Sequence, residues 1–377
     1  MVEGWWVLPA FGIWAGLLLL PWRSWSTAEA LEAADPKAGD LGDVTVLIPA
    51  RNEAGFIRST LEGLRHQGQD LKIILIDDQS NDETVPIARS LDLPNFRIIT
   101  GQPLPPGWSG KVWALEQGRA YVDTGLILLL DADIELAPGL VQTLCDKIKS
   151  EGLDMVSLMA QLRMVGFWER LLMPAFIFFF KLLYPFRLSN SPSRRVAAAA
   201  GGCILIRTCF IEVIGGFASI KGALIDDCAL AMQVKSWGGK TWIGLTHSAQ
   251  SLRSYTRLAT IWNMVARTAF TQLQYSAALL LLCSAIMVIA FFIPLLGLSA
   301  PSDQAVLLSV STLAIMVFSY VPTLRYYGLS SAWSLALPGV GLLYLMMTWT
   351  SAVRYMLGER SQWKGRLYLQ DGHKLGS

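Results

Sequence analysis

The sequence predicts an α/β domain with a mostly parallel sheet and flanking helices, together with transmembrane helices at both ends of the chain. Of its 377 residues, 53% are hydrophobic and 16% are charged, and the mean hydropathy of +0.42 is high for a soluble domain. Between the ends, short apolar runs alternate with polar helical stretches, as in α/β domains. Four apolar segments have roughly the 20-residue length that a bilayer requires: 4–22, 275–296, 305–321 and 332–353.

These patterns divide the chain into consecutive parts. A transmembrane anchor and a polar linker precede the α/β domain, and amphipathic and apolar helices follow it. We expect the anchor at 1–25, the linker at 26–43, the α/β domain at 44–252 with an interfacial helix near 166–187, an amphipathic interfacial helix at 253–274, about three transmembrane segments at 275–355 and a basic tail at 356–377.

The spans also set the expected topology. The first span has Glu3 in place of a basic leader and no small-residue cleavage site, so we expect an uncleaved anchor. Arg23 directly follows this span, which by the positive-inside rule places the α/β domain in the cytoplasm. Three later spans would put the tail outside, whereas its basic residues favour the inside. One span is therefore expected to be re-entrant or interfacial, either the short 305–321 or the Pro- and Gly-containing 332–353.

Charge and motif content argue against several functions. The net charge of +2 is small and no basic patch is interleaved with aromatic residues, so no nucleic-acid partner is predicted. The five cysteines show no paired metal-binding spacing, and we expect free thiols in a reducing compartment. No Walker-type phosphate loop and no Gly-x-Gly-x-x-Gly after the first strand is found, which disfavours ATP hydrolysis and NAD binding.

Asp131 and Asp133 directly follow the apolar run 126–130. Such a run is typical of a strand that is buried on both faces of a parallel sheet, and ligands bind outside the carboxyl ends of these strands. Mg²⁺ prefers one or two carboxylates plus substrate phosphates. The pair therefore predicts a metal site, with two solvated turn residues as the structural alternative.

Acidic residues follow two more predicted strands. Glu53 ends the segment PARNE after the strand 44–48, and Asp77 with Asp78 follows the strand 72–76. Carboxylates at strand ends are well placed to accept hydrogen bonds from a ribose hydroxyl or a base N–H. These positions therefore predict a nucleotide site.

Two further residues near these strands have structural alternatives. Asp82 is expected to cap the next helix rather than to bind a ligand. Lys111 follows a Pro- and Gly-rich loop at 103–110, and it either contacts phosphate or base or is simply solvated.

The second half of the α/β domain carries two paired motifs. Gly201 and Gly202 allow the backbone to approach a ligand closely, although tandem glycines also mark bulges and turns. Asp226 and Asp227 precede a helical pattern over 228–237, where carboxylates also cap a helix and complement its dipole. Each motif thus keeps both a functional and a structural interpretation.

Taken in order, six motifs resemble those of the family-2 inverting glycosyltransferases with the GT-A fold. The resemblance covers roughly residues 44–267, and the flanking spans are similar to the membrane-bound branch that includes ceramide glucosyltransferase. Further stretches, at 199–207, 225–231, 261–271 and 363–366, look most like the hopanoid-biosynthesis-associated glycosyltransferases of bacteria. The six motifs lie at 49–53, 77–80, 110–111, 131–133, 201–202 and 226–227.

The resemblance implies roles for individual residues. Asp227 would be the catalytic base, and Asp131 and Asp133 would hold Mg²⁺ or Mn²⁺ on the diphosphate, where a cation neutralises the leaving group. A nucleotide-sugar donor, a UDP-sugar first among them, would be bound by Glu53, Asp77, Asp78, Lys111, Asp131, Gly201, Gly202 and Asp226.

The sequence departs from the family pattern at two places. Polysaccharide synthases carry a Gln-x-x-Arg-Trp motif, of which residues 263–268 keep only Arg267, and this weakens the polymerase interpretation. Arg267 would contact the donor diphosphate or anchor the chain at the membrane interface. Asp226 stands where the family more often has Glu, which leaves its role open.

Aromatic and basic residues mix in the segment 166–186. We expect this helix to lie in the membrane interface, with core packing as the alternative, so that the acceptor is a lipid. The sequence therefore predicts a metal-dependent inverting glycosyltransferase of a bacterial-type inner membrane that moves one sugar to a lipid, plausibly in hopanoid biosynthesis. A polysaccharide synthase or polyprenyl-phosphate sugar transferase is the alternative enzyme, and a nucleotide-binding membrane scaffold is the non-catalytic one.

Overall fold

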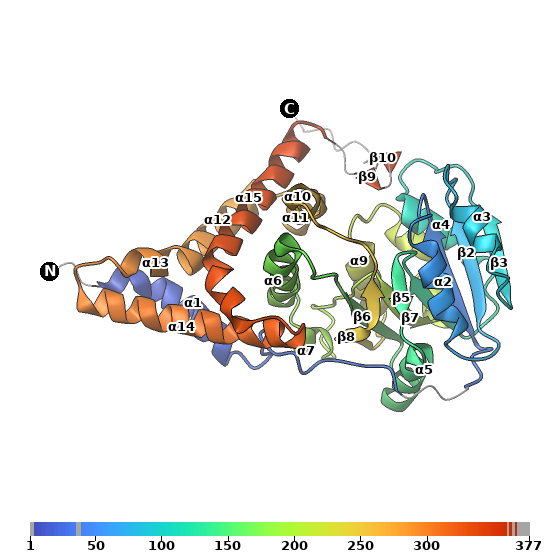
Figure 1. The fold of residues 1–377 in the computed structure, drawn as a ribbon, viewed down its shortest axis with the longest axis horizontal. Coiled ribbons are helices and arrows are strands. Elements are labelled where there is room, and N and C mark those ends of the chain that lie inside the picture. The colour runs from blue at the N-terminus through green and yellow to red at the C-terminus, as the bar shows by residue number, and fades with distance from the viewer. Residues whose placement is uncertain (1–3, 35–38, 360–361, 364–365, 368–377) are drawn as a thin grey trace. The chain divides into compact units, whose positions relative to one another are not determined.

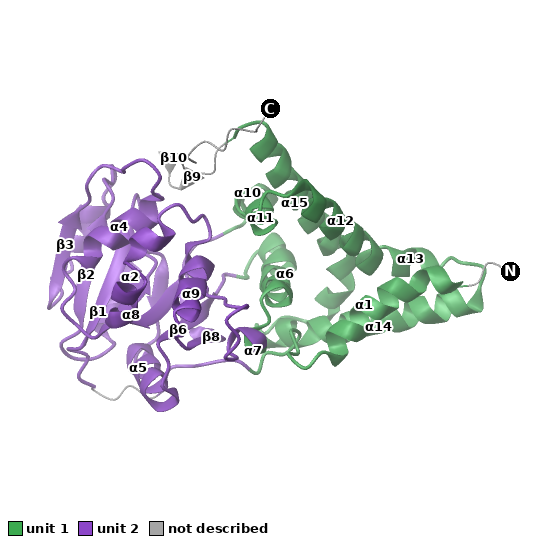
Figure 2. Cartoon of the chain, turned by 180° about the vertical axis from the view of Figure 1, so that it is seen from behind, with its two compact units in different colours: residues 1–28, 164–187, 255–359 green, residues 29–163, 188–254, 360–377 purple. Residues whose placement is uncertain are grey.

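The computed structural model describes residues 4–34, 39–359, 362–363 and 366–367. The chain forms two compact units (Figure 2), which we call the helix unit and the sheet unit. The helix unit comprises residues 1–28, 164–187 and 255–359, and the sheet unit comprises residues 29–163, 188–254 and 360–377. Both units are discontinuous in sequence, because the chain passes between them several times.

The sheet unit is built on one eight-stranded sheet with the order β3-β2-β1-β4-β7-β6-β8-β5 (Figure 1). Four of its seven pairings are parallel, and β4–β7, β6–β7 and β5–β8 are antiparallel. The strands are β1 (Val44–Ala50), β2 (Lys72–Asp77), β3 (Phe96–Thr100), β4 (Leu126–Leu130), β5 (Ile134–Leu136), β6 (Met155–Gln161), β7 (Cys203–Arg207) and β8 (Thr241–Ser251).

Helices cover both faces of this sheet, which explains the continuous apolar runs of its central strands. Every residue of β1 and of β4 is buried. Val46 and Ile48 belong to one core cluster and Leu47 to the other, because successive side chains of a strand point to opposite faces. The first cluster contains residues of α2 (Ile57–Arg65) and α5 (Leu140–Glu151), and the second contains residues of α4 (Gly110–Arg119) and α9 (Asp226–Ser236). The predicted α/β fold class is confirmed.

The helices of the sheet unit follow or precede its strands. The short α7 (Phe186–Ser189) leads into this unit from the helix unit. The others are α2 (Ile57–Arg65), α3 (Thr84–Arg89), α4 (Gly110–Arg119), α5 (Leu140–Glu151), α8 (Thr208–Val213), the 3-10 helix η2 (Phe217–Ile220) and α9 (Asp226–Ser236).

The helix unit contains three stretches that are long and apolar enough to cross a membrane: Ala277–Gly297, Asp303–Tyr326 and Ser331–Met356. The amino-terminal apolar stretch is Gly4–Leu19, so it is shorter than the predicted span at 4–22. The elements are η1 (Gly4–Val7), α1 (Leu8–Leu19), α6 (Phe167–Leu183), α10 (Leu258–Ala266), α11 (Ala269–Gln272), α12 (Ala277–Phe291), α13 (Ile293–Gly297), α14 (Asp303–Tyr326), η3 (Ser331–Ala336) and α15 (Leu337–Met356).

Two details refine the expectations for this unit. Pro338 lies in the first turn of α15, where a proline is tolerated, so it begins the helix and does not interrupt it. The middle of α6, including Leu172 and Phe178, is buried around most of its circumference, and the Tyr344 hydroxyl of α15 donates a hydrogen bond of 2.8 Å to the Leu172 carbonyl. The structure thus shows that α6 packs against other helices of its unit. Its predicted position in the membrane interface stays a prediction.

The predicted basic tail begins within the end of α15. Its short strands β9 (Gln362–Trp363) and β10 (Arg366–Leu367) pair antiparallel. Residues 360–361, 364–365 and 368–377 of this tail lie outside the described residues.

Candidate active site

The acidic motifs gather because of the sheet topology. Strands β2, β1 and β4 are neighbours and parallel, so their carboxyl ends lie at one edge of the sheet. Glu53, Asp78 and Asp131 follow these strands. The antiparallel β7 begins at the same edge, because Leu130 of β4 pairs with Cys203 of β7. The sheet thus brings four sequence-distant motifs to one place.

The tandem glycines meet the aspartate motif directly. The Asp131 N–H donates a hydrogen bond of 3.2 Å to the Gly202 carbonyl. A Cβ atom built on Gly201 would lie 3.1 Å from Lys111 Nζ and 3.3 Å from Asp227 Oδ2. Because Gly201 has no side chain, Lys111 and Asp227 can both lie close to its backbone.

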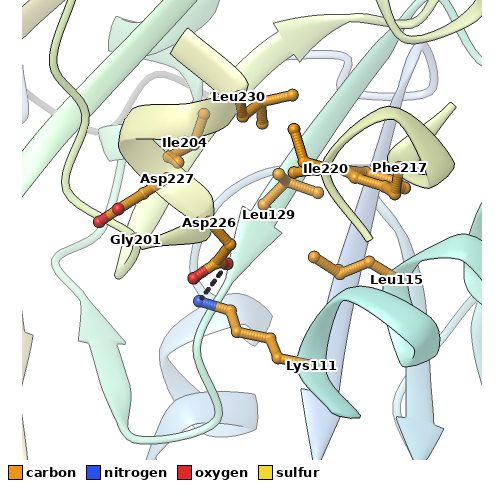
Figure 3. Close-up of a pocket in the computed structure, with 10 residues that line it drawn as sticks. All are labelled: Lys111, Leu115, Leu129, Gly201, Ile204, Phe217, Ile220, Asp226, Asp227 and Leu230. Carbon is orange, nitrogen blue, oxygen red and sulfur yellow. Dashed lines mark ion pairs between the residues drawn. The ribbon is translucent and has the colours of Figure 1, made fainter. Parts of the chain in front are cut away.

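Lys111 lies between two acidic motifs. It stands in the first turn of α4, and its Nζ is 2.7 Å from Asp131 Oδ1. The same Nζ is 3.5 Å from Asp226 Oδ2 (Figure 3). Burial alone would lower the pKa of Lys111, but the charges of Asp131 and Asp226 raise it overall. The lysine is therefore a fixed cation, and its role as a merely solvated side chain is wrong.

Asp227 has a carboxylate with a raised pKa. Burial and, second to it, the negative charge of Asp226 raise this pKa to about 7. Lys111 and the backbone N–H groups of Cys228 and Gly201 oppose this shift, and the Cys228 N–H lies 2.7 Å from Asp227 Oδ1. A carboxylate with a pKa near neutrality is suited to accept a proton at physiological pH.

A small pocket explains this burial. Lys111, Gly201, Asp226 and Asp227 form its polar part (Figure 3). Its remaining lining is apolar: Leu115, Leu129, Ile204, Phe217, Ile220 and Leu230.

The sequence analysis did not single out Arg253, which follows β8. Its Nε lies 2.8 Å from Asp133 Oδ2, and its Nη2 lies 3.0 Å from Glu53 Oε1. The guanidinium thus joins the motif after β1 to the motif after β4. No sequence signal marks this residue, because its partners are 120 and 200 positions away.

The loops after β1 and β2 interlock at the other side of this edge. The Asn52 N–H donates to the Ser80 hydroxyl at 3.0 Å, and the Asn81 N–H donates to Asn52 Oδ1 at 2.8 Å. Asp82 Oδ2 accepts from the Ala54 N–H at 3.1 Å and Oδ1 accepts from the Thr84 N–H. Asp82 thus has a structural role, although the N-cap position of α3 itself is Glu83.

Asp77 and Asp78 belong to these loops. Asp77 Oδ1 accepts a hydrogen bond of 3.1 Å from the Ser80 N–H. Asp78 is fully buried, and Arg51 lies 3.9 Å from its carboxylate and donates to its backbone carbonyl. The structure thus gives both residues a place in the loop framework.

Arg267 is the C-cap residue of α10 in the helix unit.

Asp131 and Asp133 have a donor set that fits Mg²⁺ or Mn²⁺. Within the described part of the chain, no three His, Cys, Asp or Glu side chains group into a metal site. The ion pairs with Lys111 and Arg253 each use one oxygen of a carboxylate, so the second oxygen of each is left for a cation. Two carboxylate oxygens completed by phosphate oxygens are the set that Mg²⁺ prefers.

Comparison with known proteins supports this assignment of the fold. Residues 45–215 match the family model described as glycosyl transferase family 2. This segment is a family 2 glycosyltransferase domain. The match agrees with the predicted family over this segment, and it contains the strand-end motifs and the tandem glycines. It ends before Asp226, Asp227 and Arg253.

Curated relatives share shorter segments with this chain. The 4,4'-diaponeurosporenoate glycosyltransferase of Staphylococcus haemolyticus is 34% identical over 93 residues, which cover 25% of this chain and 24% of that protein. The protein of the same name from Staphylococcus aureus is 32% identical over 110 residues, which cover 29% of each. The matches thus span roughly a quarter of these relatives' length.

A solved structure is similar over nearly the whole chain. The mannosyltransferase PcManGT from Pyrobaculum calidifontis, in complex with GDP-Man and Mn²⁺, superposes with a TM-score of 0.53 and 16% identity, covering 95% of this chain and 99% of that one. At this identity the similarity shows only that the two proteins share a fold.

Proposed function

We propose that this chain is a metal-dependent, inverting glycosyltransferase that moves one sugar from a nucleotide-sugar donor to a membrane lipid. The observation that supports it most is the pocket with Lys111, Asp226 and Asp227, whose lysine also pairs with Asp131 at the sheet edge. The pocket puts a fixed cation and a carboxylate of raised pKa side by side. A sugar transfer needs both functions.

Asp227 is proposed as the base. Its carboxylate accepts the proton of the acceptor hydroxyl while the hydroxyl oxygen attacks the anomeric carbon of the donor. The bond from that carbon to the diphosphate oxygen breaks in the same displacement, so the anomeric configuration inverts. Asp226 supports this role through its charge, which helps to keep the pKa of Asp227 high.

The donor is proposed to lie along the sheet edge. Glu53, Asp77 and Asp78 would hold the nucleoside, and Gly201 and Gly202 would border the sugar. Asp131 and Asp133 would hold Mg²⁺ or Mn²⁺, which when bound neutralises the charge of the departing diphosphate. Lys111 adds a cation of the chain itself beside this position. A UDP-sugar is the first donor to test, and Arg267 is a further candidate contact of the diphosphate.

A lipid acceptor is proposed because the same chain carries three apolar helices of membrane-crossing length. The relatives from Staphylococcus are named for 4,4'-diaponeurosporenoate, and the sequence resemblance adds a hopanoid as the candidate. We further propose a multi-pass protein of a bacterial inner membrane with its sheet unit in the cytoplasm, in agreement with Arg23 after the first apolar helix.

The full-length protein in detergent or vesicles tests this function. Labelled UDP-, GDP- and dTDP-sugars are offered with total lipid extract and Mn²⁺, and the products are separated by thin-layer chromatography and mass spectrometry. We expect one glycolipid with inverted anomeric configuration by NMR. A polymer or a lipid phosphate sugar would favour the alternative enzymes, and nucleotide binding without turnover of any donor would favour a scaffold.

Two variants make this assay specific to the pocket. Asp227→Asn removes the proposed base, and Asp146→Asn changes an exposed aspartate of α5, on the other face of the sheet. We expect transfer to be lost in the first variant and kept in the second. Comparing lipids of cells with and without the protein then identifies the acceptor from the glycolipid that disappears.

A further inference from the structure

Lys235 is a buried cation that the proposed chemistry does not use. It lies on α9, two turns after Asp227, and only 3% of its surface is exposed. Burial lowers the pKa of its ammonium group. Among the described residues no carboxylate pairs with it, so the charge is balanced by other means.

Backbone carbonyls surround this ammonium group. Lys235 Nζ donates to the carbonyl oxygens of Ser191 at 2.9 Å, Ser193 at 3.1 Å and Val196 at 2.7 Å, and also to that of Ser189. An ammonium has three N–H groups, so four carbonyls share them. The segment 189–196 thus curls around one positive charge, in the way carbonyl oxygens surround a potassium ion.

The same segment continues into the pocket. The Cys228 thiol of α9 contacts the Ala199 carbonyl at 3.4 Å, and the Ala200 N–H donates to the Ser157 hydroxyl at 2.8 Å. Gly201 comes next, and its N–H is one of the two backbone donors to Asp227. Helix α9 therefore holds the segment 189–201 near both of its ends.

We propose that Lys235 is a positioning residue: its ammonium holds the segment 189–196 so that Gly201 is presented to Asp227 and Lys111. The inference rests on the proposed function, because it gives Asp227 its partner at the site of the reaction. The cage is a site for one ammonium or potassium-sized cation, which the chain fills with its own side chain. Without that side chain, a small cation from solution takes the same place.

Chemical rescue tests this inference on the full-length protein, below the melting temperature of each variant. In Lys235→Ala we expect kcat for transfer to lipid to fall about 10- to 100-fold, as misplacement of reacting groups does, with little change in the donor KM. Ammonium or methylammonium chloride restores most of this loss, whereas tetramethylammonium chloride at equal ionic strength does not. Lys235→Met, whose stem fills the cage, is not rescued, and Lys240→Ala, at an exposed lysine, keeps full kcat.

Hydrogen exchange gives a readout that needs no turnover. We expect amides of 197–201 to lose protection in Lys235→Ala and to regain it with ammonium. Full kcat and full protection in Lys235→Ala would overturn the inference, and so would a loss that ammonium does not reverse. If neither Lys235 variant folds, as judged by circular dichroism, the lysine serves the fold and the inference fails.

An Asp227→Asn protein measured in parallel separates the two proposals. If Asp227→Asn keeps full transfer, the proposed base is wrong, while hydrogen exchange still decides the role of Lys235. If Asp227→Asn is inactive and Lys235→Ala behaves as the unchanged protein does, only the inference about Lys235 fails.

Discussion

The two aspartate pairs at this sheet edge have the same composition, share Lys111 and differ in their other partners. Asp131 and Asp133 each contact a cation of the chain, Lys111 and Arg253 respectively. Asp227 instead has backbone N–H groups, an apolar floor and a like charge beside it. The first pair is thus held ready for positive charge, while Asp227 is held ready for a proton. The partners, rather than the residue type, separate the two functions.

The largest effect on sugar transfer is expected from a change of Asp227. Asp227→Asn keeps the size of the side chain and removes its ability to accept a proton, so kcat for sugar transfer should fall about 10²- to 10⁴-fold. Donor binding, measured by calorimetry with the nucleoside diphosphate and Mn²⁺, should change little. Equal losses of both quantities would mean that Asp227 belongs to the donor site.

Removal of Asp133 should weaken metal binding. Asp133→Ala deletes one proposed ligand, and we expect Mn²⁺ in the presence of nucleoside diphosphate to bind at least about 10-fold more weakly. Electron paramagnetic resonance of free Mn²⁺ measures this without turnover. Unchanged Mn²⁺ affinity, together with activity in excess chelator, would remove the metal from the proposal.

The pH dependence tests the cause of the raised pKa. Because Asp227 acts only when deprotonated, kcat/KM should rise as the pH increases through about 7. Asp226→Asn removes the like charge, so the pKa of Asp227 falls and this acid limb moves to lower pH. At pH 6 the variant would then hold a larger active fraction than the unchanged protein. A limb that stays in place would assign the titration to another group.

The smallest effect concerns Arg253. Its guanidinium and a metal ion compete for Asp133, so Arg253→Gln should bind Mn²⁺ more tightly in the absence of nucleotide, by about two- to fivefold for a partly exposed pair. Weaker Mn²⁺ binding in this variant would show that the arginine assembles the site and does not compete for it.

Much of the sheet edge was predictable from the sequence. The continuous apolar run before Asp131 and the strands before Glu53 and Asp77 are short-range patterns, and the structure confirms these strands. Parallel pairing then brings the acidic motifs together. Their distances could not be predicted, because they depend on which loop residues contact one another.

Other features have no local signal. Arg253 meets Glu53 and Asp133 only through the pairing of β5 with β8, and the shared position of Lys111 depends on how α4 and α9 pack on one face of the sheet. The carbonyl ring around Lys235 uses backbone atoms of an irregular segment, whose side chains carry no trace of it. Pairing of elements distant in the chain creates all three.

The interrupted order of the helix unit has a consequence for synthesis. Helix α6 leaves the ribosome before α14 and α15, which pack on it in the finished protein. The apolar side chains of α6 therefore meet these partners only after more than a hundred further residues have been made. The sheet unit is not one continuous segment of the sequence either, because residues 164–187 of the helix unit separate its first two segments. The helix unit can therefore be completed only after its last helices have been made.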